Sequence, residues 1–259
     1  MIRVENLHFA YNEREVIKGI DLTFGKEILA LVGPNGSGKT TLAKHLNGLL
    51  KPTRGRVLVD GMDTREHTVA ELSRKVGYVF QNPEHMFFEE TVFKEVAFGP
   101  KNLGVSEKEV EERVRWSLKT VGLEGFEERT PYSLSGGEKQ RLAIACVLAM
   151  KPKYLILDEP TTGLDLRAER RVAEVIRSLR ERGHGVMLIT HDMDLVLELA
   201  ERVVLLSGGR KAFDGPVEAF FKLDLEHYGL EMSELLLLAE RLGVGFVRSF
   251  EELTGRVKS

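Results

Sequence analysis

Cysteine is almost absent from this sequence. Cys146 is the one cysteine among 259 residues, so no disulfide can form within the chain, which is typical of a protein from a reducing compartment. It lies in an apolar run with no nearby base to activate a thiol, and we expect a small buried residue. A disulfide scaffold and a cysteine nucleophile are both disfavoured.

Long apolar runs and an excess of positive charge are also missing. No apolar stretch reaches the ~20 residues that a helix needs to span a bilayer, and the residues from Met1 onward alternate like a strand instead of forming a signal-peptide core. The net charge of -3 gives no electrostatic reason to expect nucleic acid as a partner, because such binding usually needs a basic face. We therefore expect a chain that is soluble by itself and reaches any membrane through a partner.

Apolar residues still make up 42% of the chain, enough to build a sizeable core. The first ~25 residues alternate between apolar and polar, which predicts antiparallel strands with one wet face. Residues 28–32, 154–158 and 186–190 form nearly continuous apolar runs, as parallel strands covered on both faces should. Residues 82–150 are largely helical in pattern. The sequence predicts an α/β core with an antiparallel β subdomain and an inserted helical subdomain.

A glycine-rich turn follows the apolar run 28–32. It consists of Gly33, Pro34, Asn35, Gly36, Ser37, Gly38, Lys39, Thr40 and Thr41. Its first eight residues match the phosphate loop G-x-x-x-x-G-K-[ST], in which the lysine reaches the β- and γ-phosphates and the hydroxyl of Thr40 binds Mg²⁺. Glycines let several N–H groups point at one anion, and the helix that follows directs its positive end to the same place. The turn therefore predicts a P-loop nucleotide site.

Two carboxylates close the apolar run 154–158. Asp158, at the end of the predicted strand, can face the Mg²⁺ ion, usually through water, and Glu159 can polarise an attacking water molecule. Alone, such a pair is more often structural or a helix cap. Behind four apolar residues, before Pro160 and in a chain with a phosphate loop, it predicts a hydrolytic site.

A second glycine-rich segment, LSGGEKQ at 134–140, is rarer among proteins than a phosphate loop. Ser135, Gly136 and Gly137 place a hydroxyl and free N–H groups at the start of a predicted helix. Helix starts of this kind bind anions. The segment therefore predicts a second anion site, distinct from the first.

With the phosphate loop, LSGGEKQR and YLILDEP in this order and spacing, residues 1 to about 220 resemble the ABC ATPase family. The resemblance implies that ATP and Mg²⁺ are the cofactors and that Lys39 and Glu159 are catalytic. Gln81 resembles the Q-loop residue, with a catalytic and a metal role, and His191 the switch histidine that contacts the γ-phosphate. Asp165 resembles the D-loop residue, and Tyr11 the aromatic residue that stacks on adenine. Without this context, a lone His or Tyr beside a strand is more often structural.

The family resemblance also implies a mechanism. Two cassettes join head to tail, and each ATP lies between the phosphate loop of one chain and Ser135–Gly137 of the other. ATP closes the dimer and hydrolysis opens it, as in other switches governed by γ-phosphate contacts. Because the chain has one element of each kind, a second ABC ATPase, identical or different, is an expected partner.

Residues 80–104 resemble one subfamily more closely, because FQNP, TV, VAFGP and NLG follow one another as in the ATPases of energy-coupling-factor transporters. That resemblance implies import of a vitamin or metal ion, a transmembrane T component, and an S component that binds the substrate. It also implies a peripheral position on the cytoplasmic side of the cell membrane. Gln81–Phe88 is the expected docking segment for the T component, although Met86–Phe88 could equally be core.

The chain is expected to divide into a cassette, residues 1–222, and a C-terminal extension, residues 223–259. Leu235–Leu238 is apolar on all sides, so we expect this short helix to be buried. Packing on the chain's own core and a role in dimerisation are both open; the second is what the subfamily resemblance implies.

Three other classes of ABC protein share the ATPase motifs. Cassettes of DNA maintenance carry a long coiled coil between the two glycine-rich segments, and no heptad region separates Lys39 from Ser135. Translation-factor proteins carry two cassettes in one chain. A cassette of another importer class would share every catalytic residue and differ only at 81–104 and in the tail, so it remains the alternative.

Overall fold

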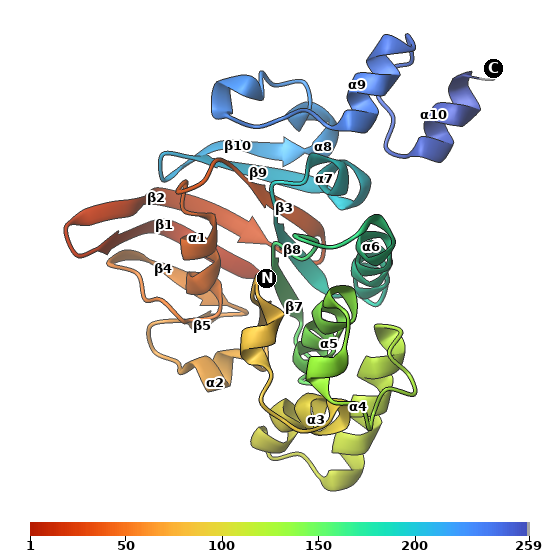
Figure 1. Ribbon diagram of the computed structural model, residues 1–259. Helices are drawn as coiled ribbons and strands as arrows, with labels where there is room; N and C mark the ends of the chain where they lie inside the picture. The colour runs from red at the N-terminus through yellow and green to blue at the C-terminus, as the bar shows by residue number, and fades with distance from the viewer. Residues whose placement is uncertain (258–259) are drawn as a thin grey trace.

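The computed structural model describes residues 1–257, which form two β-sheets with helices around them (Figure 1). The smaller sheet is antiparallel and has the strand order β2-β1-β4-β5. Its strands are β1 (Ile2–Tyr11), β2 (Arg14–Phe24), β4 (Arg54–Val59) and β5 (Met62–Asp63). Burial alternates along most of β1, as expected for a strand with one face in the core.

The larger sheet has the order β10-β9-β3-β8-β7-β6, and only β10 runs antiparallel to its neighbour. Its strands are β3 (Ile28–Val32), β6 (Val76–Val79), β7 (Tyr154–Asp158), β8 (Gly185–Ile189), β9 (Arg202–Ser207) and β10 (Arg210–Pro216). The three predicted apolar strands are confirmed, and β3, β7 and β8 are buried along their whole length. Because these strands are parallel, their carboxyl ends meet at one edge of the sheet, where ligands of α/β proteins bind.

Helix α1 (Lys39–Leu46) lies between the two sheets. Leu42 and Leu46 share an apolar cluster with residues of both sheets, such as Val4 and Ile156. The helix that follows the phosphate loop is therefore fixed on two sides. Four further helices each follow a single strand in the sequence: α2 (Val69–Leu72) after β5, α6 (Leu166–Glu181) after β7, α7 (Met193–Leu199) after β8 and α8 (Val217–Phe220) after β10.

A group of helices lies between β6 and β7 in the sequence and at one end of the molecule (Figure 1). It contains α3 (Val92–Asn102), α4 (Glu107–Thr120) and α5 (Gly136–Leu148), with the 3₁₀ helices η1 (Pro83–Met86) and η2 (Pro131–Ser133). Ser106 caps α4 by accepting a hydrogen bond from the Glu109 N–H at 3.3 Å. On α5, burial raises the pKa of the Cys146 thiol well above its ordinary value, so this cysteine stays protonated and is a poor nucleophile.

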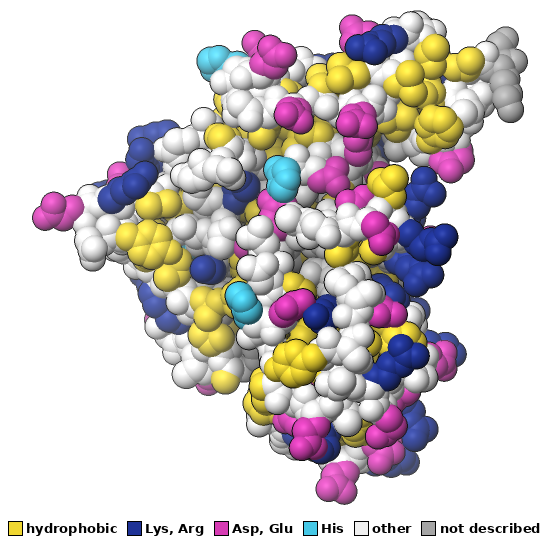
Figure 2. Space-filling view, viewed as in Figure 1, with side chains coloured by type: hydrophobic (Ala, Val, Ile, Leu, Met, Phe, Trp, Pro, Cys, Tyr) yellow, Lys and Arg dark blue, Asp and Glu magenta, His cyan; other side chains and the backbone are white. Residues whose placement is uncertain are grey.

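The C-terminal extension contains η3 (Glu226–Tyr228), α9 (Glu234–Arg241) and α10 (Phe250–Val257). The expectation that its leucine run is buried was wrong, because Leu237 and Leu238 are 43% and 40% exposed. The physical reason is that α9 packs on the body of the molecule along one side only, so part of the run faces solvent. Figure 2 shows this apolar surface near the C-terminus. Within residues 1–257, no helix is both long and apolar enough to cross a membrane.

Candidate functional site

The phosphate loop joins β3 to α1 and depends on its glycines. Gly33 and Gly38 have φ values of 144° and 105°, which only glycine adopts readily. A Cβ on Gly33 would lie 2.2 Å from the Leu206 carbonyl oxygen. No side chain caps α1 and its first turn contains no acidic residue, so the N–H groups at this helix start are free to bind an anion.

The loop borders a cavity of about 550 Å³ at the carboxyl edge of the large sheet. Besides residues 33–41, the lining includes four predicted site residues that come from distant parts of the sequence: Gln81, Asp158, Glu159 and His191. Sequence reasoning did not anticipate that Val16, Ile189, Gly229 and Leu230 also line it. The last two belong to the C-terminal extension, and no motif in the sequence marks them.

Lys39 is the cation of this cavity. Its ammonium group donates hydrogen bonds to the carbonyl oxygens of Gly33, at 2.6 Å, and Pro34, at 3.2 Å. Burial lowers the pKa of Lys39, against the opposing effect of Glu159 and Asp158. A phosphate group entering the loop would supply the negative charge that the partly buried ammonium lacks.

Asp158 lies beside the first turn of α1 and is only 6% exposed. Its carboxylate accepts hydrogen bonds from the Tyr78 hydroxyl, at 2.7 Å, and from Thr40. Burial raises the pKa of Asp158 and also that of Tyr78. A hydroxyl and a carboxylate in contact, next to a phosphate site, are hard oxygen ligands of the kind that Mg²⁺ prefers. Tyr78, which orients the carboxylate, was missed because a strand tyrosine carries no motif.

Glu159 and His191 form a second polar pair. The Nδ1 atom of His191 lies 2.9 Å from Oε2 of Glu159, and the Thr162 hydroxyl donates to the same oxygen at 3.2 Å. Glu159 has a φ of 50°, a left-handed conformation that is uncommon for a residue with a side chain and is often found at functional sites. The carboxylate is thus held at the cavity edge, where it can orient a water molecule.

The remaining predicted residues lie outside this cavity. Tyr11 is 47% exposed and its ring meets that of Phe9 in a T-shaped arrangement, with ring centroids 4.8 Å apart. Asp165 begins α6 and accepts a hydrogen bond from the Ala168 N–H at 2.8 Å. Ser135, Gly136 and Gly137 lie at the start of α5 and do not line the cavity.

The start of α5 has a partner that the sequence analysis did not identify. The Glu138 carboxylate accepts hydrogen bonds from the Ser135 N–H, at 2.8 Å, and from its hydroxyl, at 2.9 Å. Both bonds lower the pKa of Glu138, and the bond from the backbone N–H has the larger effect. The S-x-x-E spacing of a capping box was the available signal.

Comparison with known proteins agrees with this geometry. A family model described as ABC transporter matches residues 17–162. A protein of Pyrococcus abyssi, provisionally named as an ABC transporter ATP-binding protein, is 61% identical and aligns over 98% of each chain. The energy-coupling factor transporter ATP-binding protein EcfA of Methanothermobacter thermautotrophicus is 45% identical, over 87% of this chain and 74% of its own.

Among solved structures, cbiO1 of Clostridium perfringens, described as part of the ABC transporter complex cbiONQ, is similar with a TM-score of 0.81. It is 34% identical, and the match covers 93% of this chain and 96% of that one. The two-sheet α/β architecture is therefore that of an ABC ATPase, as the sequence predicted. The chain belongs to the ABC transporter family and is an ATP-hydrolysing subunit of an ABC transporter.

Proposed function

We propose that this ATPase energises an importer of the energy-coupling-factor type, which takes up a vitamin or a metal ion. The observation that carries the proposal is an exposed aromatic surface in the segment that follows Gln81. Phe88 and Phe98 are 58% and 43% exposed, and their rings meet edge to face at 4.7 Å. Exposed aromatic clusters of this kind are typical of sites that bind other proteins.

Hydrogen bonds with buried and neighbouring side chains hold the backbone of this surface in place. Glu95, which is 5% exposed, accepts hydrogen bonds from the N–H groups of Phe88, at 3.0 Å, and Glu89, at 2.8 Å. Phe87 points into the core, and its carbonyl accepts a hydrogen bond from Tyr132 at 2.7 Å. Of the two interpretations of this aromatic segment, Phe87 fits the core and Phe88 fits a docking surface. We infer that a helix of a transmembrane T component binds here.

In this proposal the cavity binds ATP, with its phosphates against loop 33–41 and Lys39. Mg²⁺ would be held by Thr40, Asp158 and Gln81, and would neutralise charge on the β- and γ-phosphates when bound. Glu159 orients the attacking water and accepts its proton, while His191 positions that carboxylate and contacts the γ-phosphate. Tyr11 stacks on the adenine ring from outside the cavity.

A second cassette completes each site. ABC ATPases dimerise, and in this chain the residues Ser135–Gly137 and Asp165 lie apart from the cavity that holds Lys39. We propose that these residues face the nucleotide of a partner ATPase. The exposed leucines of α9 would extend the same dimer interface. The dimer would lie on the cytoplasmic side of the cell membrane, held there by the T component, and an S component would select the substrate.

The test is affinity purification of the tagged chain from detergent-solubilised membranes of its host, with identification of the co-purifying proteins by mass spectrometry. We expect a polytopic T-like protein and an S component whose identity reveals the substrate. If the ATPase dimer is a heterodimer, a second ATPase should co-purify as well. A pair of permeases of another importer class would instead support the alternative.

The docking surface is tested with Phe88→Ser and Phe98→Ser. Both variants should lose the T-like protein yet keep the ATPase activity of the purified chain, since neither residue lines the cavity. Val257→Ser is the matched control, because Val257 is a 53% exposed apolar residue at the end of α10, away from α3 (Figure 1) and outside the leucines of α9 that we assign to the dimer interface. Retention of the T-like protein by both phenylalanine variants would contradict the proposed surface.

A further inference from the structure

The C-terminal extension holds the start of helix α7, the helix that begins two residues after His191. Asp194, in the first turn of α7, accepts hydrogen bonds from the Ser233 hydroxyl and, at 3.3 Å, from the Leu235 N–H. Ser233 is 1% exposed and is the N-cap of α9. One carboxylate therefore serves the positive ends of two helices, which fixes α9 to α7.

The extension also holds the end of α7. Arg248, between α9 and α10, donates hydrogen bonds from Nε to the Leu197 carbonyl, at 3.1 Å, and from Nη2 to the Ala200 carbonyl. The last carbonyl groups of a helix lack partners within it, so the guanidinium group caps α7. The Arg248 N–H donates in turn to Glu252 at 2.9 Å, which ties this cap to α10.

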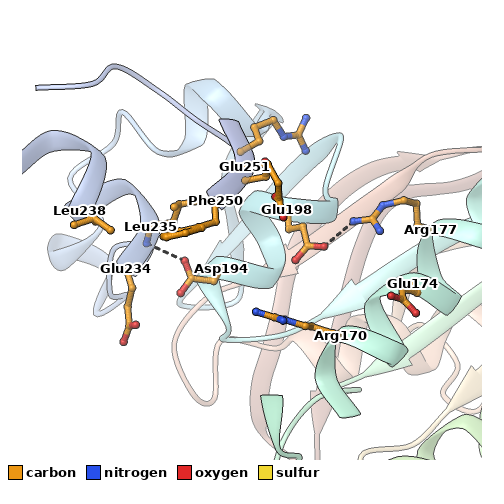
Figure 3. A pocket seen from close by; sticks show the side chains of 12 residues that line it. Arg170, Glu174, Arg177, Asp194, Glu198, Glu234, Leu235, Leu238, Phe250 and Glu251 are labelled. Carbon is orange, nitrogen blue, oxygen red and sulfur yellow. Dashed lines mark hydrogen bonds and ion pairs between the residues drawn. The ribbon is translucent and has the colours of Figure 1, made fainter. Parts of the chain in front are cut away.

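The side of α7 between these two attachments faces a cavity of about 990 Å³, bounded by α6, α7 and the two helices of the extension (Figure 3). Across it, Arg177 of α6 forms an ion pair with Glu198 of α7 at 2.6 Å. Both side chains are more than 40% exposed, and exposed pairs of this kind contribute little. Leu195 and Leu199 pack into the main core, and the extension adds directional hydrogen bonds at both ends of α7.

His191 lies two residues before the start of α7, so a shift of α7 would be passed on to it. Asp192 caps α7 by accepting a hydrogen bond from the Leu195 N–H at 2.9 Å, and its own N–H donates to Thr190 at 3.0 Å. His191 is therefore confined between the end of β8 and the first turn of α7. The extension also reaches the nucleotide cavity directly, through Gly229 and Leu230, which line it.

We propose that Asp194 and Arg248 are positioning residues for ATP hydrolysis, which attach α7 to the C-terminal extension and so keep His191 against Glu159. The proposal rests on the role of His191 given above. It makes the extension part of the catalytic apparatus of its own chain, in addition to any part in pairing two chains. Neither residue touches the nucleotide cavity, so both act through α7.

The test measures steady-state ATP hydrolysis by the purified full-length chain and its Asp194→Ala and Arg248→Gln variants. We expect kcat to fall about 3- to 10-fold in each variant, with KM and the affinity for ATP unchanged because the phosphate loop is untouched. Asp194→Asn should retain more activity than Asp194→Ala, since its amide oxygen can still accept a hydrogen bond from Ser233. Glu174→Gln, which alters the charge of the same cavity from α6, is the control and should behave as wild type. Thermal unfolding identifies a temperature at which all variants are folded.

A double-mutant cycle separates positioning from simple structural support. In a His191→Ala chain, followed by single-turnover hydrolysis, Asp194→Ala should cause no further loss, because the residue it positions is gone. An additive loss, or an unchanged kcat in Asp194→Ala and Arg248→Gln, would overturn the proposal and leave the role of His191 intact. An unchanged kcat in His191→Ala itself would overturn the role of His191, and this proposal with it.

Discussion

Helices α1 and α5 both begin at a glycine-rich turn, but their N-termini differ in side-chain capping and in charge. The first turn of α1 has no side-chain cap and no acidic residue, and it begins with Lys39. At the start of α5, the Glu138 carboxylate already accepts hydrogen bonds from the N–H and hydroxyl of Ser135. The first helix start therefore attracts an anion by itself, whereas the second carries a negative charge of its own.

This difference indicates which of the two anion sites is complete within a single chain. Around α1, the cavity brings together Lys39, Asp158, Glu159 and His191, so binding and hydrolytic groups are assembled within the chain. At the start of α5, by contrast, the Ser135 hydroxyl already donates a hydrogen bond within the chain, to the Glu138 carboxylate. We expect the α5 site to act only when the phosphate of a nucleotide on another chain is brought to it.

The largest expected effect is that of Glu159→Gln, which tests whether the first site is complete. Since general-base residues typically contribute about 10²- to 10⁴-fold, kcat should fall by at least about 100-fold while ATP still binds. Phosphate release and binding of a fluorescent ATP analogue measure the two quantities. Glu181→Gln, an exposed carboxylate at the end of α6, is the control. A kcat within a few-fold of wild type would show that another group activates the water.

The next largest effect is expected from Gly136→Ala, which tests whether the second site works in trans. A Cβ at Gly136 would lie 3.6 Å from the Leu164 side chain, an ordinary van der Waals contact, so folding and ATP binding at the phosphate loop should be unchanged. The added methyl group would occupy the surface that faces the partner nucleotide, and both kcat and ATP-driven dimerisation should fall about 10-fold. Size-exclusion chromatography with ATP, in the Glu159→Gln chain, measures the dimer. Normal dimerisation would place the partner nucleotide elsewhere.

The sequence predicts the first site better than the second, for a physical reason. A phosphate loop works through backbone N–H groups and glycine geometry, so its residues are adjacent in the chain and their spacing is fixed. The strands that carry the first site, β3, β7 and β8, are also predictable, because each is a nearly continuous apolar run. By contrast, Tyr78 acts through a hydrogen bond with Asp158, and Glu138 acts through hydrogen bonds with Ser135. Of these, only Glu138 leaves a pattern, the S-x-x-E spacing.

The extension was the least predictable part. Its leucine run indicated a buried helix, but whether an apolar side chain in a short surface helix is covered depends on a partner that the sequence does not contain. Gly229 and Leu230 line the nucleotide cavity only because the chain returns past β9 and the phosphate loop. Such a return is a property of the tertiary fold, and no local pattern near residue 229 indicates it.

A smaller effect is expected from the ion pair that joins the second site to the Q-loop. Lys139, one turn after Ser135, lies 2.7 Å from Glu84, three residues after Gln81. We expect Lys139→Glu to lower kcat about 3-fold by loosening the start of α5, and the exchange Glu84→Lys with Lys139→Glu to restore most of it. Steady-state hydrolysis by the four chains measures this. If the exchange restores nothing, the lysine acts through some contact other than Glu84.

The smallest expected effect is that of Glu138→Gln, which makes the second helix start more like the first. Glutamine preserves the capping box, because its amide oxygen still accepts from Ser135, but it removes the negative charge that a triphosphate must approach. ATP-driven dimerisation in the Glu159→Gln chain should therefore need about 2- to 5-fold less ATP. The gain should shrink at high salt, where exposed charges are screened. Weaker dimerisation in Glu138→Gln would mean that the carboxylate supports the second site, and the contrast between the two helix starts would then be one of geometry alone.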